Sequence, residues 1–174
     1  MRHYDPFTTD DTRSRRRSLI SVSLGPLEMS KRKRRQSGRC LCGSVRFRIA
    51  GPLRPTVIAC HCRNCRRFSG GLFTVTAARK EHLVITKKGS LKWFKSSKHS
   101  KRGFCGKCGS SLFGGSDQWP FVSISAASLN EPTGLKLAVH SWTEESADYW
   151  SFDPKLPRRR GPSGLGGPPA NLER

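Results

Sequence analysis

The amino-acid sequence predicts a small, mostly β fold of stacked antiparallel sheets, held together by cysteine-containing turns and flanked by disordered basic tails. Three observations lead to this prediction. Seven cysteines lie in tight groups, short runs of alternating apolar and polar residues recur along the middle of the chain, and both ends are rich in arginine. Hydrophobic residues make up 34% of the 174 residues, which is low for a chain that is folded throughout. One domain with polar extensions is therefore expected.

The clearest strand signal is at residues 44–49, where Val45, Phe47 and Ile49 alternate with polar residues. A period of two is typical of a strand with one buried face. The other candidate strands are residues 56–59, 72–77, 82–86, 91–95, 112–113, 121–126 and 135–140. The spacers between them are short, and no long amphipathic helix is predicted. These features favour a small all-β domain.

The two ends of the chain differ from the middle in composition. Residues 1–39 carry 11 Lys and Arg against 4 acids, and residues 155–174 carry 5 against 1. Basic segments with little apolar content cannot bury enough surface to fold. Residues 1–37 and 158–174 are therefore predicted to be disordered, and residues 38–157 to form the domain. Met29 is an alternative start of translation, which would make residues 1–28 a mis-assigned extension.

All seven cysteines belong to closely spaced groups. The groups are a C-x-C pair, Cys40 and Cys42; a C-x-C-x-x-C triplet, Cys60, Cys62 and Cys65; and a C-x-x-C pair, Cys105 and Cys108. Core packing does not require such spacings, whereas a turn of this kind aims several sulfurs at one metal ion. Gly106 and Gly109 give the last pair the composition of a zinc-knuckle turn. Zinc, which takes about four such ligands, explains the pattern best.

Seven ligands divide as four plus three. The two pairs, Cys40, Cys42, Cys105 and Cys108, are predicted to form a structural four-cysteine site that ties the start of the domain to its second half. The triplet then offers only three ligands. A zinc with three protein ligands keeps an open position, which is the arrangement that catalysis requires. Two zincs per chain are expected, the second one at Cys60, Cys62 and Cys65.

Three other interpretations of the cysteines stay open. Disulfides would leave one cysteine over, and C-x-C pairs are too close to bridge comfortably. An iron–sulfur cluster would need a fourth cysteine from one of the pairs. A histidine such as His140 could close the triplet site, which would make both zincs structural.

Residues beside the triplet are candidates for binding a substrate. Arg63, Arg66 and Arg67 could hold the carboxylates of a tripeptide thiol, and His61 could move a proton to an alkoxide. The alternatives are a solvated basic turn for the arginines and a packed or water-facing side chain for His61.

The chain resembles the glutathione-dependent formaldehyde-activating enzymes, a family that also includes centromere protein V. The matching segments are Gly38-x-Cys40-x-Cys42-Gly43-x-Val45, Cys60-x-Cys62-x-x-Cys65-Arg66, Gly103-Phe104-Cys105-x-x-Cys108-Gly109-Ser110-x-Leu112 and His140-x-Trp142. The resemblance covers about residues 38–157 and implies a small fold of stacked, mostly antiparallel sheets. It also implies a structural zinc on the two pairs and a zinc placed for chemistry on the triplet. Leu41 departs from the histidine that many members have between the first two cysteines.

The resemblance and the cysteine pattern together predict a zinc-dependent carbon–sulfur lyase. Such an enzyme makes or breaks S-hydroxymethyl-type adducts of a small thiol, glutathione or similar, and an aldehyde such as formaldehyde. The alternative is a binding module for nucleic acid or a protein partner, with two structural zincs and no catalysis.

The partners and the compartment are expected from charge and composition. The formal net charge is +21, but the domain shows no cluster of exposed aromatic and basic residues, so nucleic acid is expected to bind only through the basic tails. No apolar run is long enough to span a membrane. Because free thiolates need a reducing compartment, the cytoplasm is expected.

Overall fold

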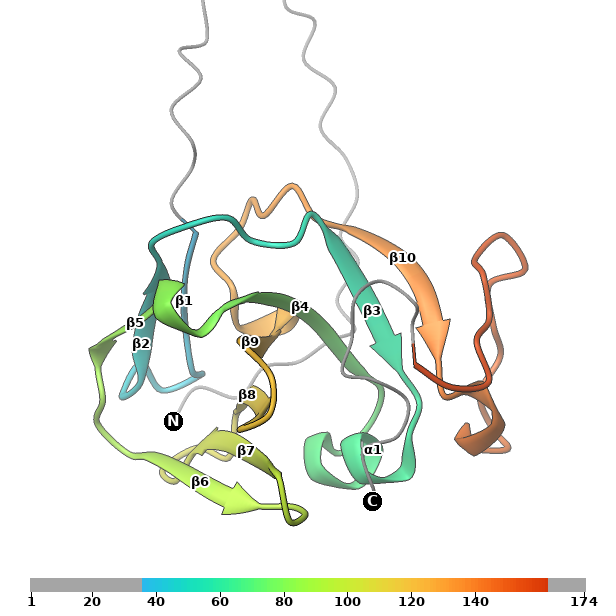
Figure 1. Cartoon of the computed structure of the whole chain (residues 1–174), viewed down its shortest axis with the longest axis horizontal. Coiled ribbons are helices and arrows are strands. Elements are labelled where there is room, and N and C mark those ends of the chain that lie inside the picture. The colour runs from blue at the N-terminus through green and yellow to red at the C-terminus, as the bar shows by residue number, and fades with distance from the viewer. Residues whose placement is uncertain (1–35, 163–174) are drawn as a thin grey trace, which may run out of the picture. The chain divides into compact units, whose positions relative to one another are not determined.

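The structure is a computed structural model that describes residues 36–162, so most of the two predicted tails lies outside the described residues. The prediction of a mostly β fold is confirmed (Figure 1). The strands are β1 (Ser37–Arg39), β2 (Arg46–Ile49), β3 (Thr56–Cys60), β4 (Phe73–Arg79), β5 (Leu83–Lys87), β6 (Leu91–Lys95), β7 (Ser100–Cys105), β8 (Ser111–Ser116), β9 (Phe121–Ser125) and β10 (Lys136–Ser141). The helical segments are α1 (Arg63–Ser69) and the 3₁₀ turns η1 (Lys80–His82), η2 (Ala126–Ser128) and η3 (Thr143–Glu145).

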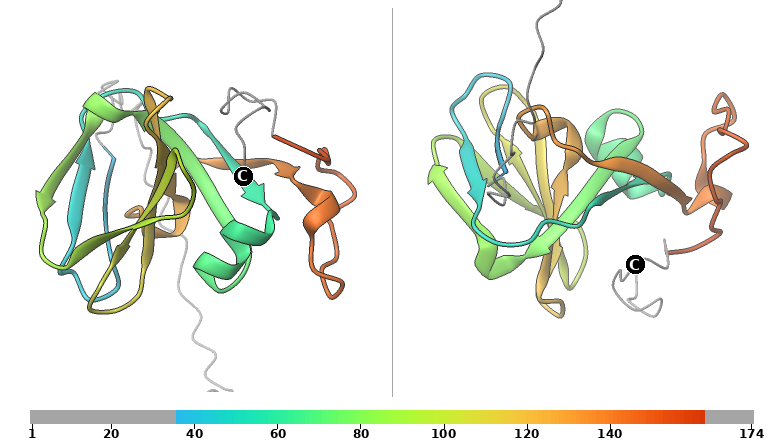
Figure 2. Two further views of the ribbon diagram at one scale, coloured as in Figure 1. Left: turned by 60° about the horizontal axis from the view of Figure 1, so that its bottom comes forward. Right: turned by 90° about the horizontal axis from the view of Figure 1, so that it is seen from above.

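The described strands form two sheets. Strands β1, β2 and β5 form a small sheet in that order, and the larger one has the order β10-β3-β4-β9-β8-β7-β6. Every pairing is antiparallel except that of β10 with β3, which lie side by side and run parallel in Figures 1 and 2. This one parallel pair brings the segment after β10 next to the segment after β3, where the cysteine triplet begins.

The hydrophobic core lies between the two sheets. Burial along β2 alternates as the sequence predicts, so that Phe47 and Ile49 point inward while Arg46 and Arg48 face solvent. The ring of Phe47 meets that of Phe113 from β8 edge to face, with centroids 5.0 Å apart. Burying two such rings supplies a large apolar contact to a domain of this size. The core therefore fixes the first cysteine pair, just before β2, relative to the strands of the large sheet.

Helix α1 lies between the candidate strands 56–59 and 72–77, where no helix is predicted from the sequence. The chain instead continues into a seven-residue helix whose N-cap is Cys62, with its sulfur accepting a hydrogen bond from Cys65 N. Gly70 ends the helix with a φ of 77°, a conformation that glycine adopts without strain. No residue of α1 is buried, so the helix has no apolar stripe that a sequence pattern could reveal.

Strand β6 corrects the expectation that the domain lacks exposed aromatic residues among basic ones. Trp93 is 42% exposed and Phe94 is 56% exposed, and both lie between Lys92 and Lys95. The physical reason is topological, since β6 is an edge strand of the large sheet. An edge strand has a neighbour on one side only, and both of its faces can remain in contact with solvent.

Backbone pairing continues past the expected domain boundary at Pro157. The backbone of His140 donates to Pro157 O and accepts from Arg159 N, at 2.9 and 2.8 Å, and Trp142 N donates to Gly161 O at 2.9 Å. Residues 157–161 thus run along the outer edge of β10. The backbone N–H and C=O of His140 on that edge are thereby satisfied.

Within residues 36–162, no helix has both the length and the apolar character needed to cross a membrane.

Candidate metal centre

The two cysteine pairs meet at one point of the fold. The sulfurs of Cys40, Cys42, Cys105 and Cys108 all lie within 4.8 Å of one another. Cys40 Sγ is 3.6 Å from Cys42 Sγ, which is 3.7 Å from Cys105 Sγ. Four sulfurs bound tetrahedrally at the usual zinc–sulfur distance would be about 3.8 Å apart. The donor set and its spacing therefore fit a closed metal site.

Hydrogen bonds orient the sulfurs of this four-cysteine cluster. Val45 N donates to Cys40 Sγ at 3.2 Å, and Ser90 Oγ lies 3.0 Å from Cys105 Sγ. Ser110 Oγ lies 3.3 Å from Cys108 Sγ, and this contact lowers the pKa of the Cys108 thiol to about 5. Such outer partners favour the thiolate, which is the form that binds metal.

The cysteine triplet forms a second group. The sulfurs of Cys60, Cys62 and Cys65 lie within 4.8 Å of one another, at the end of β3 and in the first turn of α1. Within residues 36–162, no His, Cys, Asp or Glu ligand atom completes this group as a fourth member. Arg102 Nη1, on β7, donates to Cys65 Sγ at 3.4 Å. A guanidinium beside a cluster of thiols favours their ionised form.

The three thiols share protons unequally. Hydrogen bonds from Cys60 and Cys65 lower the pKa of Cys62, and the same hydrogen bonding raises the pKa of the buried Cys60. One sulfur of the triplet thus becomes negative before the other two. A cation that enters the cluster meets a thiolate that its neighbours already stabilise.

A cavity of about 270 Å³ borders the triplet. Its lining combines the three cysteines with aromatic residues and with a few polar and charged groups. The aromatic residues are Phe73, Trp119 and Trp142, and the charged ones are Lys101, Arg102 and Glu145. The cavity is small enough to enclose a ligand of a few atoms next to the sulfurs, with cations at hand for an anionic group.

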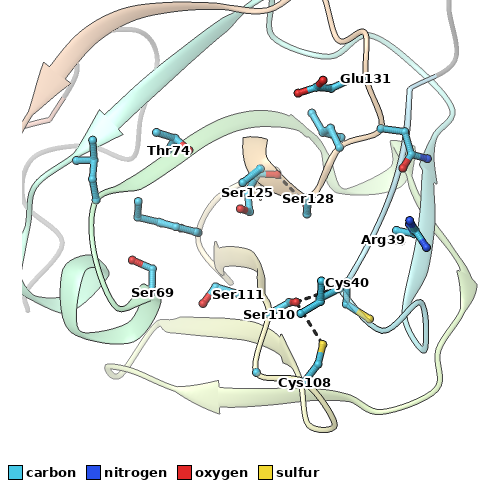
Figure 3. Close-up of a pocket in the computed structure, with 17 residues that line it drawn as sticks. Arg39, Cys40, Ser69, Thr74, Cys108, Ser110, Ser111, Ser125, Ser128 and Glu131 are labelled. Carbon is cyan, nitrogen blue, oxygen red and sulfur yellow. Dashed lines mark hydrogen bonds between the residues drawn. The ribbon is translucent and has the colours of Figure 1, made fainter. Parts of the chain in front are cut away.

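A larger cavity, of about 640 Å³, lies beside the four-cysteine cluster and is shown in Figure 3. Cys40, Cys108 and Ser110 stand together at its rim, where Ser110 also accepts a hydrogen bond from Leu41 N. None of the triplet cysteines lines it. Because the cluster that it borders already has four ligands, we place the candidate reaction site at the smaller cavity instead.

A family model described as "Glutathione-dependent formaldehyde-activating enzyme" matches residues 35–145, which is well over half of the chain. The chain belongs to this family. The match spans the four-cysteine cluster and the triplet, and it ends at Glu145, the acid that lines the triplet cavity. The predicted membership is thus confirmed.

Two individual proteins can be compared with this member of the glutathione-dependent formaldehyde-activating family. A Halomonas elongata protein named "Putative glutathione-dependent formaldehyde-activating enzyme" is 28% identical over 127 residues, which cover 64% of this chain and 77% of that protein. A crystal structure of a Rhodobacter sphaeroides protein is 21% identical and matches 59% of this chain and 99% of its own, with a TM-score of 0.48.

The residues predicted to bind substrate in this family member lie around α1 but not on the cavity wall. Arg63 N donates to Glu145 Oε2 at 2.8 Å, and Arg66 Nη2 donates to Glu145 O at 3.2 Å. His61 is 2% exposed, and its Nε2 lies 2.8 Å from His140 Nδ1. None of these residues lines the triplet cavity. The structure thus gives Arg63 and Arg66 contacts that hold Glu145 against the helix.

His140, the residue that could have closed the triplet site, does not join the group of three sulfurs. Its ring is buried against His61 and Phe152. Burial lowers the pKa of both imidazoles, and that of His61 falls to about 4. The pair is therefore neutral at physiological pH and acts as a packed, hydrogen-bonded unit.

Sequence reasoning missed the three charged residues at the cavity. Lys101 and Arg102 come from β7 and Glu145 from η3, and each is more than 35 positions away from the triplet in the chain. The only sequence signal near Glu145 is the His140-x-Trp142 motif, which places Trp142 on the cavity wall. Arg102 has no such signal, because its contact with Cys65 depends on how the folded chain places β7 beside α1.

Proposed function

We propose that this chain is a zinc-dependent carbon–sulfur lyase, which makes or breaks S-hydroxymethyl-type adducts of a small thiol, such as glutathione, and an aldehyde. The observation that carries the proposal is the three-sulfur group of Cys60, Cys62 and Cys65 at the wall of a cavity, with no fourth ligand atom grouped with it in residues 36–162. The four-cysteine cluster would hold a second, structural zinc. The family and the name of the Halomonas elongata relative support this choice of reaction.

Zinc at the triplet would supply a position at which an incoming thiol is held as a thiolate. Three cysteine thiolates already exceed the charge of one Zn²⁺ by one. A further anionic sulfur therefore needs positive charge nearby, and Arg102 and Lys101 on the cavity wall provide it. The same two residues can hold a carboxylate of the thiol. From the sequence, this role was expected of Arg63, Arg66 and Arg67, and a proton-transfer role of His61. None of the four lines the cavity, so our proposal moves the carboxylate-binding role to β7.

Part of the cavity wall is apolar. Trp119, Trp142 and Phe73 present apolar surface around the sulfurs. Exclusion of water strengthens the attraction between a bound anion and Arg102. In the proposed reaction, the thiolate sulfur bonds to the carbonyl carbon of the aldehyde, the carbonyl electron pair moves to the oxygen, and this oxygen takes a proton from solvent. The reverse reaction breaks the same carbon–sulfur bond.

Leu41 does not stand on the wall of the triplet cavity. Its side chain is 83% exposed, and it lines the cavity beside the four-cysteine cluster. The departure from the histidine common in the family therefore leaves the proposed reaction site unchanged. We propose a thiol with carboxylates as the substrate, and a reducing compartment, the cytoplasm, as the place of action.

The proposal is tested by NMR of ¹³C-formaldehyde mixed with glutathione, in which exchange between free aldehyde and the S-hydroxymethyl adduct is measured with and without protein. The metal-loaded chain should speed the exchange above the spontaneous rate. Cys62→Ser should abolish the acceleration. The matched control is Cys42→Ser, which removes one sulfur from the other cluster and, in folded preparations, should keep the acceleration. Exchange at the spontaneous rate with glutathione and with every other thiol tested would favour a module with two structural zincs.

A further inference from the structure

A third cavity, a cleft on the large sheet, adjoins the triplet cavity and shares Ser100, Lys101, Gly115 and Ser116 with it. It has a volume of about 660 Å³ and is bounded by the β6–β7 hairpin, by η1 and the start of β5, and by β8 and β9. Its apolar lining residues are Leu83, Trp93 and Val122. We call it the Trp93 cleft. No cysteine lines it; the proposed lyase reaction uses Lys101, where the cleft meets the triplet cavity, and gives the rest of the cleft no role.

The rim of the Trp93 cleft is strongly cationic. Its lysines are Lys80, Lys95, Lys98 and Lys101. The acid of the lining is Asp117, which lies 3.3 Å from His99 Nδ1. In residues 36–162, none of the four lysines forms an ion pair with an acid, although Lys80 Nζ donates to Ser116 O at 2.7 Å. The cleft therefore presents an unneutralised positive charge.

The register of the hairpin increases this charge at one point. Lys95 on β6 lies directly opposite Lys101 on β7, and both side chains are exposed. Like charges opposite each other in a sheet destabilise it. A bound anion would offset this repulsion.

Trp93 offers an aromatic surface between these cations. Its ring lies across Gly103 and stacks towards Phe113, with centroids 6.0 Å apart and planes 23° apart. A Cβ at Gly103 would lie 3.0 Å from Trp93 Cζ3, a tight contact that glycine avoids. The ring stays 42% exposed, and Lys101 Nζ lies over it, 4.8 Å from the centroid. A flat, partly exposed ring thus lies beside a row of lysines.

We propose that the Trp93 cleft binds single-stranded nucleic acid. One base stacks on Trp93, and Lys95, Lys98 and Lys101 contact the phosphates on either side of it. An aromatic platform with a cationic groove is the combination that holds unpaired bases and their backbone. A duplex hides the faces of its bases, so a single strand fits the exposed ring better. The net charge of the whole chain is +21. This charge attracts the same partner over a longer distance.

The distribution of the lysines favours a strand over a free nucleotide. Lys80 belongs to η1, Lys95 to β6, Lys98 to the hairpin loop and Lys101 to β7. A single phosphate group can contact only a few of them, whereas successive phosphates along a strand can meet cations around the whole rim. A strand and a free nucleotide share the same base and phosphate groups, so only the length of the ligand distinguishes them in a binding test.

The test is fluorescence anisotropy of a labelled 12-nucleotide thymidine oligonucleotide, titrated with the full metal-loaded chain over a range of salt. The cleft variant is Lys95→Gln, Lys98→Gln and Lys101→Gln. Its matched control is Lys87→Gln, Lys107→Gln and Lys136→Gln, which removes three exposed lysines that do not line the cleft. The cleft variant should bind at least about tenfold more weakly, and its log–log salt slope should be smaller by about 2. An equal loss in both variants would overturn the proposal.

A second pair of measurements isolates the stacking. Trp93→Leu should weaken binding of the oligonucleotide about tenfold and leave the salt slope unchanged. An abasic strand of the same length should bind the wild type about as weakly as Trp93→Leu binds the normal strand. Affinity that is indifferent to both changes would overturn the role of Trp93. A mononucleotide that binds as tightly as the oligonucleotide would overturn the assignment to a strand.

Discussion

Arg102 Nη1 on β7 lies 3.4 Å from Cys65 Sγ on α1, and the same guanidinium packs over the ring of Phe68 at 5.6 Å. The contact joins the large sheet to the helix that carries the last triplet cysteine. It also puts a permanent positive charge beside the proposed zinc site. The excess charge of −1 that three thiolates would have with Zn²⁺ is thus offset by a residue that is distant in sequence.

Replacing Arg102 by methionine should make the triplet metal easier to remove with acid. Without the guanidinium the thiolates are less stable, so protons compete for the sulfurs at a higher pH. The midpoint of metal release should rise by roughly half a pH unit to one unit, as measured with a chromogenic chelator. Arg67→Met removes an exposed arginine of the same helix and is the control. Equal midpoints in Arg102→Met and Arg67→Met would contradict this role.

Cysteine variants of the two clusters should differ in their effect on folding. Cys105 is 0% exposed and belongs to the hydrophobic core, so Cys105→Ser should lose a metal and unfold or aggregate. Cys62→Ser should keep its circular dichroism spectrum and lose only the triplet metal, because serine is a good N-cap for α1. Metal analysis of the wild type should give two zincs per chain. Similar folding defects in the two variants would refute the division.

The buried histidine pair should stay neutral in mildly acidic solution. Burial lowers the pKa of His61 to about 4 and lowers that of His140 as well. Both imidazoles should therefore show neutral chemical shifts at pH 6.5, where an ordinary histidine is half protonated. Unfolded histidines take up protons first, so the free energy of unfolding should fall as pH drops below about 6.5. A titration midpoint at or above 6.5 for either ring in the folded, metal-loaded chain would disprove the assignment.

Truncation should locate the end of the domain. A chain that stops at Pro157 loses three backbone hydrogen bonds to β10 and the segment after it, and also the contact of Arg158 with Phe152. The loss should lower the free energy of unfolding by about 2–4 kcal/mol, measured in urea. A chain that stops at Pro162 keeps these contacts and is the control. If both truncations are equally stable, residues 158–161 do not support β10.

The sequence predicts those parts of the fold that depend on local pattern. The alternation of Val45, Phe47 and Ile49 locates β2. The spacing of the cysteines predicts two separate clusters, and in the structure the cysteines of each predicted cluster lie together. Each of these signals lies within a few neighbouring residues. The chemistry of thiols then indicates a metal without any knowledge of the fold.

Features that depend on long-range register could not be predicted in this way. Arg102 reaches Cys65 only because β7 lies next to α1, and residues 157–161 become an edge segment only because β10 is available. Helix α1 was missed because it is short and exposed, with a cysteine as its N-cap. The exposure of Trp93 follows from the edge position of β6, and no feature of the Lys92–Lys95 sequence alone indicates an edge.

The central proposal, that the triplet metal has an open position for a thiol, is tested most directly with cobalt in place of zinc. Cobalt(II) reports its ligands by its visible absorption, so a thiol that enters the fourth position should shift the spectrum with a saturable dependence on thiol concentration. We expect this shift with glutathione in the wild type and its loss in Cys62→Ser, which retains only the cobalt of the four-cysteine cluster. A wild-type spectrum that no thiol changes would contradict the proposal and leave a protein with two structural metal sites.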